Sequence, residues 1–106
     1  MTESLKAILS ELKSQFQELY GDRLVQMVLY GSQARDDAEP GSDIDVLVVL
    51  SGEVNPVREM ELAGDITFDL GYRNDTIVSC MFIDEATYNR GQGPYVRNVQ
   101  REGTAI

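Results

Sequence analysis

The run Ile44–Leu50 constrains the fold of this chain more than any other segment. Six of its seven residues are Ile, Val or Leu, which is typical of a strand covered on both faces. Asp45 interrupts the run, and an ionised carboxylate within an apolar strand is costly unless it is paired or binds a metal. The run therefore predicts a central strand of a covered sheet with a functional carboxylate in it.

Two long segments show helical periodicity. Apolar residues at three- and four-residue steps predict an amphipathic helix over Leu5–Tyr20, with a Thr or Ser just before it as the cap. The segment Val57–Tyr72 also fits a helix, although Ile66–Leu70 within it could form a short strand. We favour the helix because the segment is long and begins just after Pro56. The expected inner face of this helix is Val57, Met60, Ala63 or Gly64, Thr67 and Leu70.

The remaining elements complete a small sheet flanked by helices. Leu24–Tyr30 and Thr76–Ile83 are predicted strands, and short helices are expected to start at Asp84 and to cover Tyr95–Glu102. The predicted order is α-β-α-β-α-β-α, an α/β (α+β) fold with a mixed sheet at its centre. A length of 106 residues predicts one domain, residues 1–106, with one modest core.

Composition excludes several classes of function. Lys and Arg total 9 against 18 Asp and Glu, a net charge of -9, so neither direct nucleic-acid binding nor an anionic membrane surface is expected. No apolar stretch is long enough for a membrane span and no signal segment opens the chain, so we expect a cytoplasmic protein. With one Cys and no His, a metal would be hard and carboxylate-bound, meaning Mg²⁺, Mn²⁺ or Ca²⁺.

The chemistry-bearing residues lie where the first strand ends and the second begins. Gly31 lets the backbone approach a ligand closely, and Ser32 can start a turn whose N–H groups bind phosphate oxygens. Asp43 and Asp45 are two residues apart on a predicted strand, so both side chains point to one face. Two carboxylates beside a phosphate cradle suit one or two Mg²⁺ ions bridging to a triphosphate.

Together with its flanks, this pattern resembles the glycine-serine and aspartate signature of the DNA polymerase beta-like nucleotidyltransferase superfamily, in particular the minimal nucleotidyltransferases of prokaryotes. The segment Tyr95–Gly103 resembles the tail of one subgroup. The resemblance implies the nucleotidyltransferase fold and transfer of a nucleoside monophosphate, AMP from ATP, with pyrophosphate leaving.

The resemblance also implies roles for individual residues. Gly31 and Ser32 would hold the phosphates, and Asp43 and Asp45 would hold Mg²⁺ or Mn²⁺. Arg35 could reach a phosphate, since a guanidinium binds one well. The alternative for Arg35 is a surface ion pair with the neighbouring Asp36 or Asp37.

One departure from the family pattern concerns a third carboxylate on the following strand. The matching position holds Ser79, and a serine is a weak metal ligand and no general base without help. A different strand register would put Asp75 or Asp69 at this position, and we take Asp75 as the better candidate for a catalytic role. The alternative is that Asp75 and Asp69 are both solvated surface charges.

The resemblance supplies a partner as well. A chain this short is expected to take its acceptor from another protein. The resemblance implies a candidate, because many minimal nucleotidyltransferases are antitoxins paired with HEPN-domain toxins, which are ribonucleases, and some transfer AMP to a tyrosine of the toxin. The alternative is a catalytically silent binding module that neutralises its partner by contact, and a stand-alone transferase of another pathway is a third possibility. The five tyrosines, Tyr30 and Tyr95 among them, are interpreted as core or rim aromatics, and Cys80 as an inert core residue.

Overall fold

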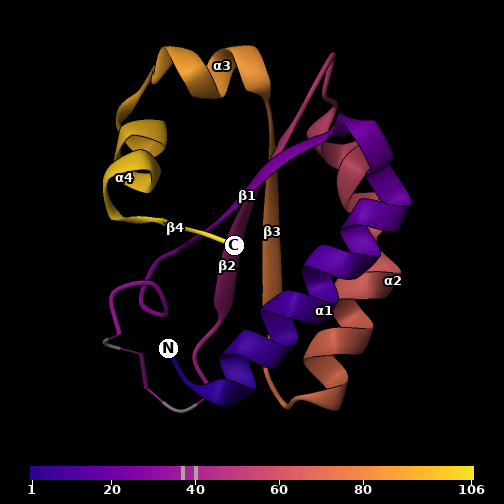
Figure 1. Cartoon of the computed structure of the whole chain (residues 1–106), viewed down its shortest axis with the longest axis vertical. Helices are drawn as coiled ribbons and strands as arrows, with labels where there is room; N and C mark the ends of the chain where they lie inside the picture. The colour runs from indigo at the N-terminus through magenta and orange to yellow at the C-terminus, as the bar shows by residue number, and fades with distance from the viewer. Residues whose placement is uncertain (37, 40) are drawn as a thin grey trace.

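A single mixed sheet forms the centre of the computed structural model, which describes residues 1–36, 38–39 and 41–106. Its strands are β1 (Leu24–Tyr30), β2 (Ile44–Leu50), β3 (Val78–Asp84) and β4 (Thr104–Ala105), in the order β3-β2-β1-β4 (Figure 1). β1 is antiparallel to both β2 and β4, whereas β2 and β3 are parallel. This is the predicted fold class, a small mixed sheet flanked by helices.

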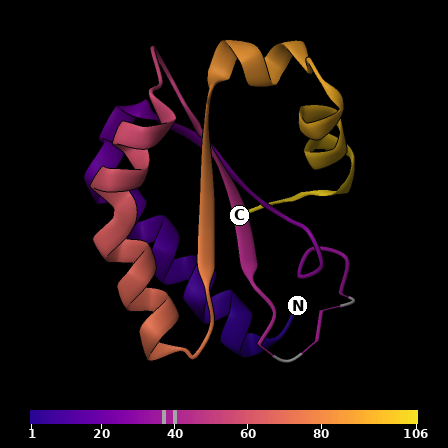
Figure 2. The same ribbon diagram turned by 180° about the vertical axis from the view of Figure 1, so that it is seen from behind.

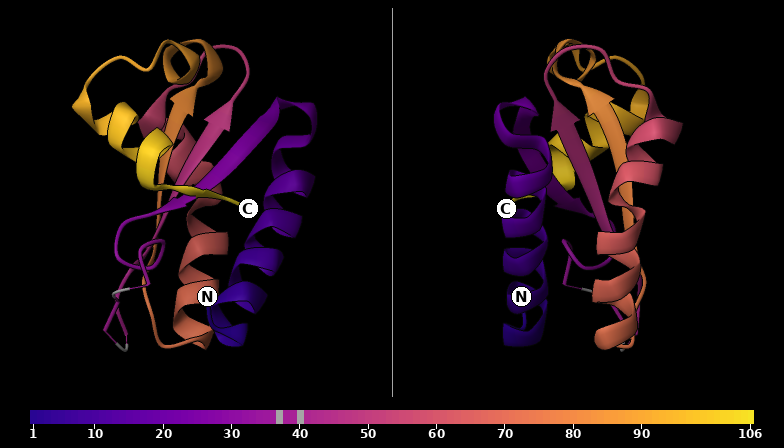
Figure 3. Two further views of the ribbon diagram at one scale, coloured as in Figure 1. Left: turned by 60° about the vertical axis from the view of Figure 1, so that its left-hand side comes forward. Right: turned by 90° about the vertical axis from the view of Figure 1, so that its right-hand side faces the viewer.

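Helices cover both faces of the sheet. The long helices α1 (Glu3–Tyr20) and α2 (Pro56–Arg73) lie on one face, and the short helices α3 (Glu85–Arg90) and α4 (Pro94–Glu102) lie on the other (Figures 1 and 3). A short 3₁₀ turn, η1 (Gly21–Arg23), joins α1 to β1. Within the described parts of the chain, no helix combines the length and apolar character needed to cross a membrane.

The two faces of β2 pack against different helices. Ile44, Val46, Val48 and Leu50 belong to the core beneath α1 and α2. Leu47 and Val49 pack with Tyr88, Val96 and Val99 from α3 and α4. The covered central strand is therefore confirmed. Because side chains alternate along a strand, Asp45 shares its face with Leu47 and Val49, on the α3 and α4 side.

The predicted order is wrong at one place. No helix stands between β1 and β2 in the described residues, because the chain after Tyr30 forms only a hydrogen-bonded turn. The two strands are consecutive and antiparallel. The sequence analysis also missed β4, whose Thr104–Ala105 pairs with Val28 and Leu29.

The second long segment is a helix, as favoured, but its inner face is rotated from the predicted one. Ala63 and Leu70 are buried, whereas the side chains of Val57 and Met60 are exposed. The helix instead buries Glu59, whose Oε2 accepts a hydrogen bond from Nη2 of Arg23 at 3.0 Å. A charged partner on the neighbouring element thus draws a carboxylate inward, which a hydrophobic pattern cannot reveal.

Cys80 is buried in β3 and belongs to the core beneath α1 and α2. Burial, with the Asp45 carboxylate as a weaker second cause, raises the pKa of its thiol to about 12. The thiol is therefore protonated at neutral pH and unreactive, which confirms its interpretation as an inert core residue.

Candidate functional site

The end of β1 lies directly against Asp45. In the antiparallel register Tyr30 pairs with Asp45, and Gly31 follows with φ of 77°, in the left-handed region that favours glycine. A Cβ placed on Gly31 would lie only 2.8 Å from Oδ2 of Asp45. Glycine therefore meets two demands here, the backbone conformation and the close approach of main chain to carboxylate.

A turn follows Gly31 and presents backbone donors. The carbonyl of Gly31 accepts hydrogen bonds from the N–H groups of Ala34 at 3.1 Å and Arg35 at 3.3 Å. The N–H groups of Ser32 and Gln33 come before Ala34, the first residue that donates within this turn. They occupy the same place as the first N–H groups of a helix, where backbone donors bind anionic oxygens. The two candidate phosphate-binding residues, Gly31 and Ser32, thus lie at the same corner of the sheet as Asp45.

Two side chains fix the segment that enters β2. Gln33 donates from Nε2 to the carbonyl oxygen of Ser42 at 3.1 Å, and Thr76 donates its hydroxyl to the same oxygen at 3.1 Å. The amide of Ile44 also donates to the carbonyl of Ile77 at 2.8 Å. These bonds tie the backbone on both sides of Asp43 to the turn and to the residues before β3.

Electrostatics single out the two aspartates. Partial burial is the larger cause of a raised pKa at Asp45, and the nearby Asp43 carboxylate raises the pKa further. Two like charges this close favour a bound cation, because a cation removes the penalty of ionising both. Mg²⁺ is typically bound in proteins by one or two carboxylates together with substrate phosphates and water. The donors present therefore fit Mg²⁺ or Mn²⁺ completed by phosphate oxygens.

Within the described residues, the position on β3 that pairs with Asp45 does not carry a third carboxylate. Ser79 is the residue paired with Asp45 across the parallel strands, so the position next to the aspartate carries a hydroxyl. Asp75 lies in the loop between α2 and β3, where it lines one cavity beside Tyr72 and another that includes Ser42 and Ile44. Among the residues that the structure describes, no three His, Cys, Asp or Glu side chains are grouped to hold one ion. Asp43, Asp45 and Asp75 therefore do not form such a group, and a catalytic role of Asp75 stays a prediction.

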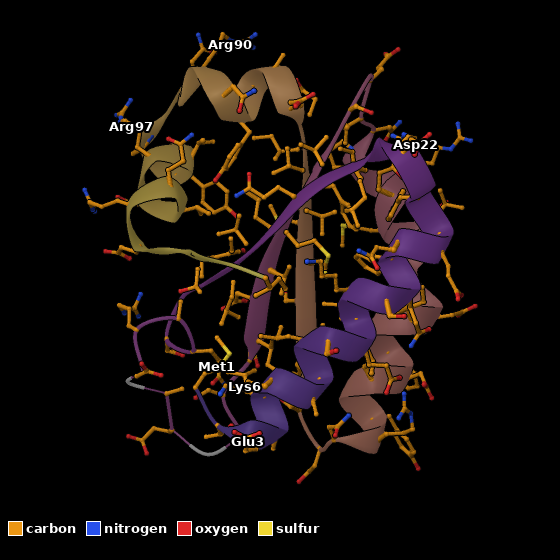
Figure 4. All side chains as sticks on the ribbon, in the orientation of Figure 1. Met1, Glu3, Lys6, Asp22, Arg90 and Arg97 are labelled. Atoms are coloured by element: carbon orange, nitrogen blue, oxygen red, sulfur yellow. The ribbon has the colours of Figure 1, made fainter. Side chains whose placement is uncertain are left out.

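Arg35 is engaged near the same turn. Its Nη1 lies 3.6 Å from Oε2 of Glu102 at the end of α4, which connects the turn to that helix. Asp36 pairs instead with the amino group of Met1 at 3.3 Å, and Met1 is labelled in Figure 4. Asp37, the other partner considered, lies outside the described residues. A phosphate contact by Arg35 stays a prediction.

A tyrosine pair at the site was not predicted as part of it. Tyr95, at the start of α4, donates its hydroxyl to that of Tyr30 at 3.0 Å, with the rings nearly perpendicular. Burial and this hydrogen bond, with the charge of Asp45, raise the pKa of Tyr30. Alternation along the predicted strand assigns Tyr30 to one face of the sheet. It does not show which residues lie next to Tyr30, because these depend on the strand register. The segment Tyr95–Gly103 resembles the tail of one subgroup, but nothing local in that segment indicates a contact of Tyr95 with Tyr30.

The raised pKa of Asp45 predicts a stability effect in the absence of divalent cations. Between the pKa of the unfolded chain, about 4, and the higher folded value, the folded state binds more protons, so the wild type loses stability as pH rises. Asp45→Asn should therefore raise Tm at pH 7 by about 2–5 °C, and the gain should vanish near pH 3. Mg²⁺ should raise Tm of the wild type more than that of the variant.

Scanning calorimetry across pH, with and without Mg²⁺, measures this effect. The exposed carboxylate Asp65 on α2 provides the control, because Asp65→Asn should move Tm little and without dependence on Mg²⁺. A Tm of Asp45→Asn equal to that of the wild type at every pH would contradict the assigned electrostatics.

Known proteins are similar to this chain over most of its length. The nucleotidyltransferase domain family matches residues 9–101. A Methanocaldococcus jannaschii protein named putative protein adenylyltransferase MJ0604 is 28% identical over 105 residues, which are 98% of this chain and 95% of that protein. A second protein of the same organism, putative protein adenylyltransferase MJ0141, is 29% identical over 72 residues, 68% of this chain and 72% of its own.

Solved structures share the fold. A structure named as a putative nucleotidyltransferase from Sulfolobus solfataricus has a TM-score of 0.57 at 21% identity, covering 99% of this chain and 86% of that one. A toxin–antitoxin structure with AMP-PNP has a TM-score of 0.57 at 20% identity, covering 89% of this chain and 68% of that one. With a family match that spans residues 9–101 and this arrangement of Gly31, Ser32, Asp43 and Asp45, the chain belongs to the nucleotidyltransferase domain family.

Proposed function

We propose that this protein transfers AMP from ATP to a hydroxyl group of a partner protein. The observation that carries the proposal is the close approach of Gly31 to Asp45, where a Cβ on the glycine would lie 2.8 Å from Oδ2 of the carboxylate. This approach supports a site in which the turn after Gly31 binds phosphate beside Asp45. The family match supports nucleotidyl transfer. The relative named putative protein adenylyltransferase, matched over 95% of its length, supports a protein acceptor.

In this proposal the turn and the two aspartates have different roles. Ser32 and the backbone N–H groups after Gly31 hold the triphosphate, while Asp43 and Asp45 would hold Mg²⁺ or Mn²⁺. When bound, the ion neutralises phosphate charge and orients the triphosphate. The acceptor oxygen forms a bond to the α-phosphorus, and the bond from that phosphorus to the bridging oxygen of the β-phosphate breaks. Pyrophosphate leaves with the electron pair of that bond.

The proton of the acceptor hydroxyl passes to water in this scheme. No carboxylate stands at the position next to Asp45 on β3, since Ser79 occupies it. Turnover is therefore expected to be slow and to rise with pH as the acceptor ionises more readily.

The partner proposed is a toxin of the HEPN class, with this chain as its antitoxin. The resemblance to minimal nucleotidyltransferases supports this pairing, and so does the shared fold with solved toxin–antitoxin structures. A net charge of -9 also favours association with a basic ribonuclease, because opposite potentials speed encounter.

Mass spectrometry of the partner tests the proposal. The protein encoded beside this chain's gene is incubated with the purified chain, ATP and Mg²⁺, and one AMP unit is expected on a hydroxyl-bearing residue. An unmodified partner with every nucleoside triphosphate, under conditions where the two proteins form a complex, would refute the enzymatic proposal.

A second candidate function is neutralisation by contact alone. The hydroxyl of Ser79 in place of a carboxylate is the observation that favours it, because the site then lacks a base. This candidate predicts that Asp43→Asn with Asp45→Asn leaves toxin neutralisation unchanged. Under the first proposal the same double substitution abolishes both modification and its protective effect.

Ser79→Asp is expected to increase AMP transfer, roughly tenfold or more. An added carboxylate would lie beside Asp45 on the same face, where it can bind metal or accept the acceptor's proton, and general bases contribute about 10²–10⁴-fold. Initial rates at saturating Mg²⁺ measure the effect. Ser79→Asn, of similar size but without charge, is the control, and equal rates for both variants would contradict this reading of the position.

A further inference from the structure

A band of exposed apolar side chains runs along α2 and into the start of β3. Phe68 and Tyr72 are 73% and 79% exposed, and their rings stack with centroids 6.1 Å apart. Met60 on the same helix and Ile77 just before β3 are also exposed. Large apolar side chains gathered in one place on a soluble surface mark an interaction site more often than scattered ones do.

These side chains border a groove between α2 and β3. One cavity of about 510 Å³ is lined by residues that include Phe68, Tyr72 and Ile77. A second of about 180 Å³ includes Met60 and also shares Ile77, so the two adjoin. We name this feature the α2–β3 groove. β3 is the outer strand of the described sheet, and Figures 1 and 2 show α2 beside this edge. The residues that line the two cavities come from α2, from β3 and from the segment between them.

Charge indicates what the groove can bind. Among the described residues that line the two cavities, Asp75 is acidic and none is Lys or Arg. Glu61 and Asp65 are exposed on the same stripe of α2 as Phe68, at helical spacings. The nearby cation Arg73 is paired with Glu11 and Asp69. The complementary ligand is an apolar protein segment that carries Lys or Arg.

The same charges disfavour two other occupants. A second copy of this chain would set acidic groups against acidic groups, with a net charge of -9 on each molecule. Phosphate-rich nucleic acid would meet the same repulsion. The basic side chains Arg90 and Arg97, labelled in Figure 4, lie on α3 and α4, away from α2.

The groove reaches the candidate site. Ser79 lines the smaller cavity and is the residue paired with Asp45 on β2. Paired residues on adjacent strands lie about 5 Å apart, so a chain seated in the groove passes the edge of the sheet beside the carboxylate. A docked partner can therefore extend an acceptor hydroxyl around this edge.

We propose that the α2–β3 groove is the docking surface for the partner protein that accepts AMP, through an apolar segment bearing Lys or Arg. This inference rests on the proposed function. Phe68 and Tyr72 are the anchors of the interface, because aromatic side chains are enriched at interfaces and Tyr is enriched among the residues that dominate binding. Asp65 and Asp75 orient the partner through its basic residues.

The test uses Phe68→Ala with Tyr72→Ala in the whole chain, and the purified product of the adjacent gene as partner. Both side chains are exposed, so folding should be unchanged by circular dichroism and calorimetry. Calorimetric titration should show affinity weakened about a hundredfold, and transfer should show a raised KM for the partner with kcat within about threefold. Leu62→Ala, exposed on α2 but outside the groove lining, is the matched control and should bind normally.

Reversing the charge of one acidic residue beside the groove is a second, independent test of the docking surface. Asp65→Lys should weaken binding several-fold, and the loss should shrink at high salt because the interaction is electrostatic. Unchanged affinity in both the aromatic and the charge variants would overturn the docking inference. A wild-type dimer that the aromatic variant dissociates would overturn it as well, by showing that a second copy occupies the groove.

The two proposals can fail separately. If the wild type binds the partner through the groove but transfers no AMP, the proposed function fails and the docking surface stands. If AMP is transferred equally by the wild type and the aromatic variant at low partner concentration, the docking inference fails and the function stands. Absence of any complex with the wild type counts against the docking inference.

Discussion

Gly31→Ala is expected to reduce AMP transfer about a hundredfold while the chain stays folded. A methyl group at this position would meet Oδ2 of Asp45 at 2.8 Å, so either the turn or the carboxylate must move. A displacement of about 1 Å of a group in the reacting site costs roughly 10²-fold in rate. The left-handed backbone adds a loss of stability of about 1–2 kcal/mol.

Gly52→Ala separates these two effects. Gly52 also has a positive φ, 78°, but a Cβ there meets nothing within 4 Å. Both variants should lose similar stability in urea unfolding, and only Gly31→Ala should lose transfer. Equal transfer rates for the two would contradict the role assigned to the contact between Gly31 and Asp45.

Asp43→Asn with Asp45→Asn is expected to lower transfer by about a thousandfold or more, because a bound metal contributes several kcal/mol of charge stabilisation. The substitution keeps size and hydrogen-bonding capacity but removes both charges. Titration with Mn²⁺, followed by its paramagnetic effect on water relaxation, should show loss of metal binding along with the loss of rate.

Asp65→Asn with Glu61→Gln is the matched control for that double variant. It removes two exposed carboxylates from α2, so the change in net charge is the same while the site is intact. Transfer to a small hydroxyl acceptor, which needs no docking, should then equal that of the wild type. A comparable loss in the control would show that net charge, rather than the aspartate pair, governs the rate.

The strands that bear the site could be predicted because their signals are local. The bounds of Leu24–Tyr30 and Ile44–Leu50 match β1 and β2, since each strand is a short apolar run ended by turn residues. The two-residue strand at Thr104 has no such run. It forms because α4 ends at Glu102 and returns the chain to β1, a consequence of tertiary packing.

The residues of the candidate site likewise fall into those that the sequence can predict and those that it cannot. Gly31, Ser32, Asp43 and Asp45 stand out by residue type and spacing along the chain. The hydroxyl pair of Tyr30 and Tyr95 depends on how α4 packs against the sheet, and sequence pattern does not contain that information. The residue beside Asp45 on β3 is also set by tertiary structure, because the strand register decides it. In the structure that residue is Ser79 and not Asp75.

Label transfer from ATP tests the central claim most directly. The chain, the partner and Mg²⁺ are incubated with ATP labelled either at the α-phosphate or at the γ-phosphate, and the proteins are then separated. The account predicts label on the partner from α-labelled ATP only, with the wild type and Gly52→Ala but not with Gly31→Ala or the double aspartate variant. Label from γ-labelled ATP, or equal α-label with all four proteins, would contradict it.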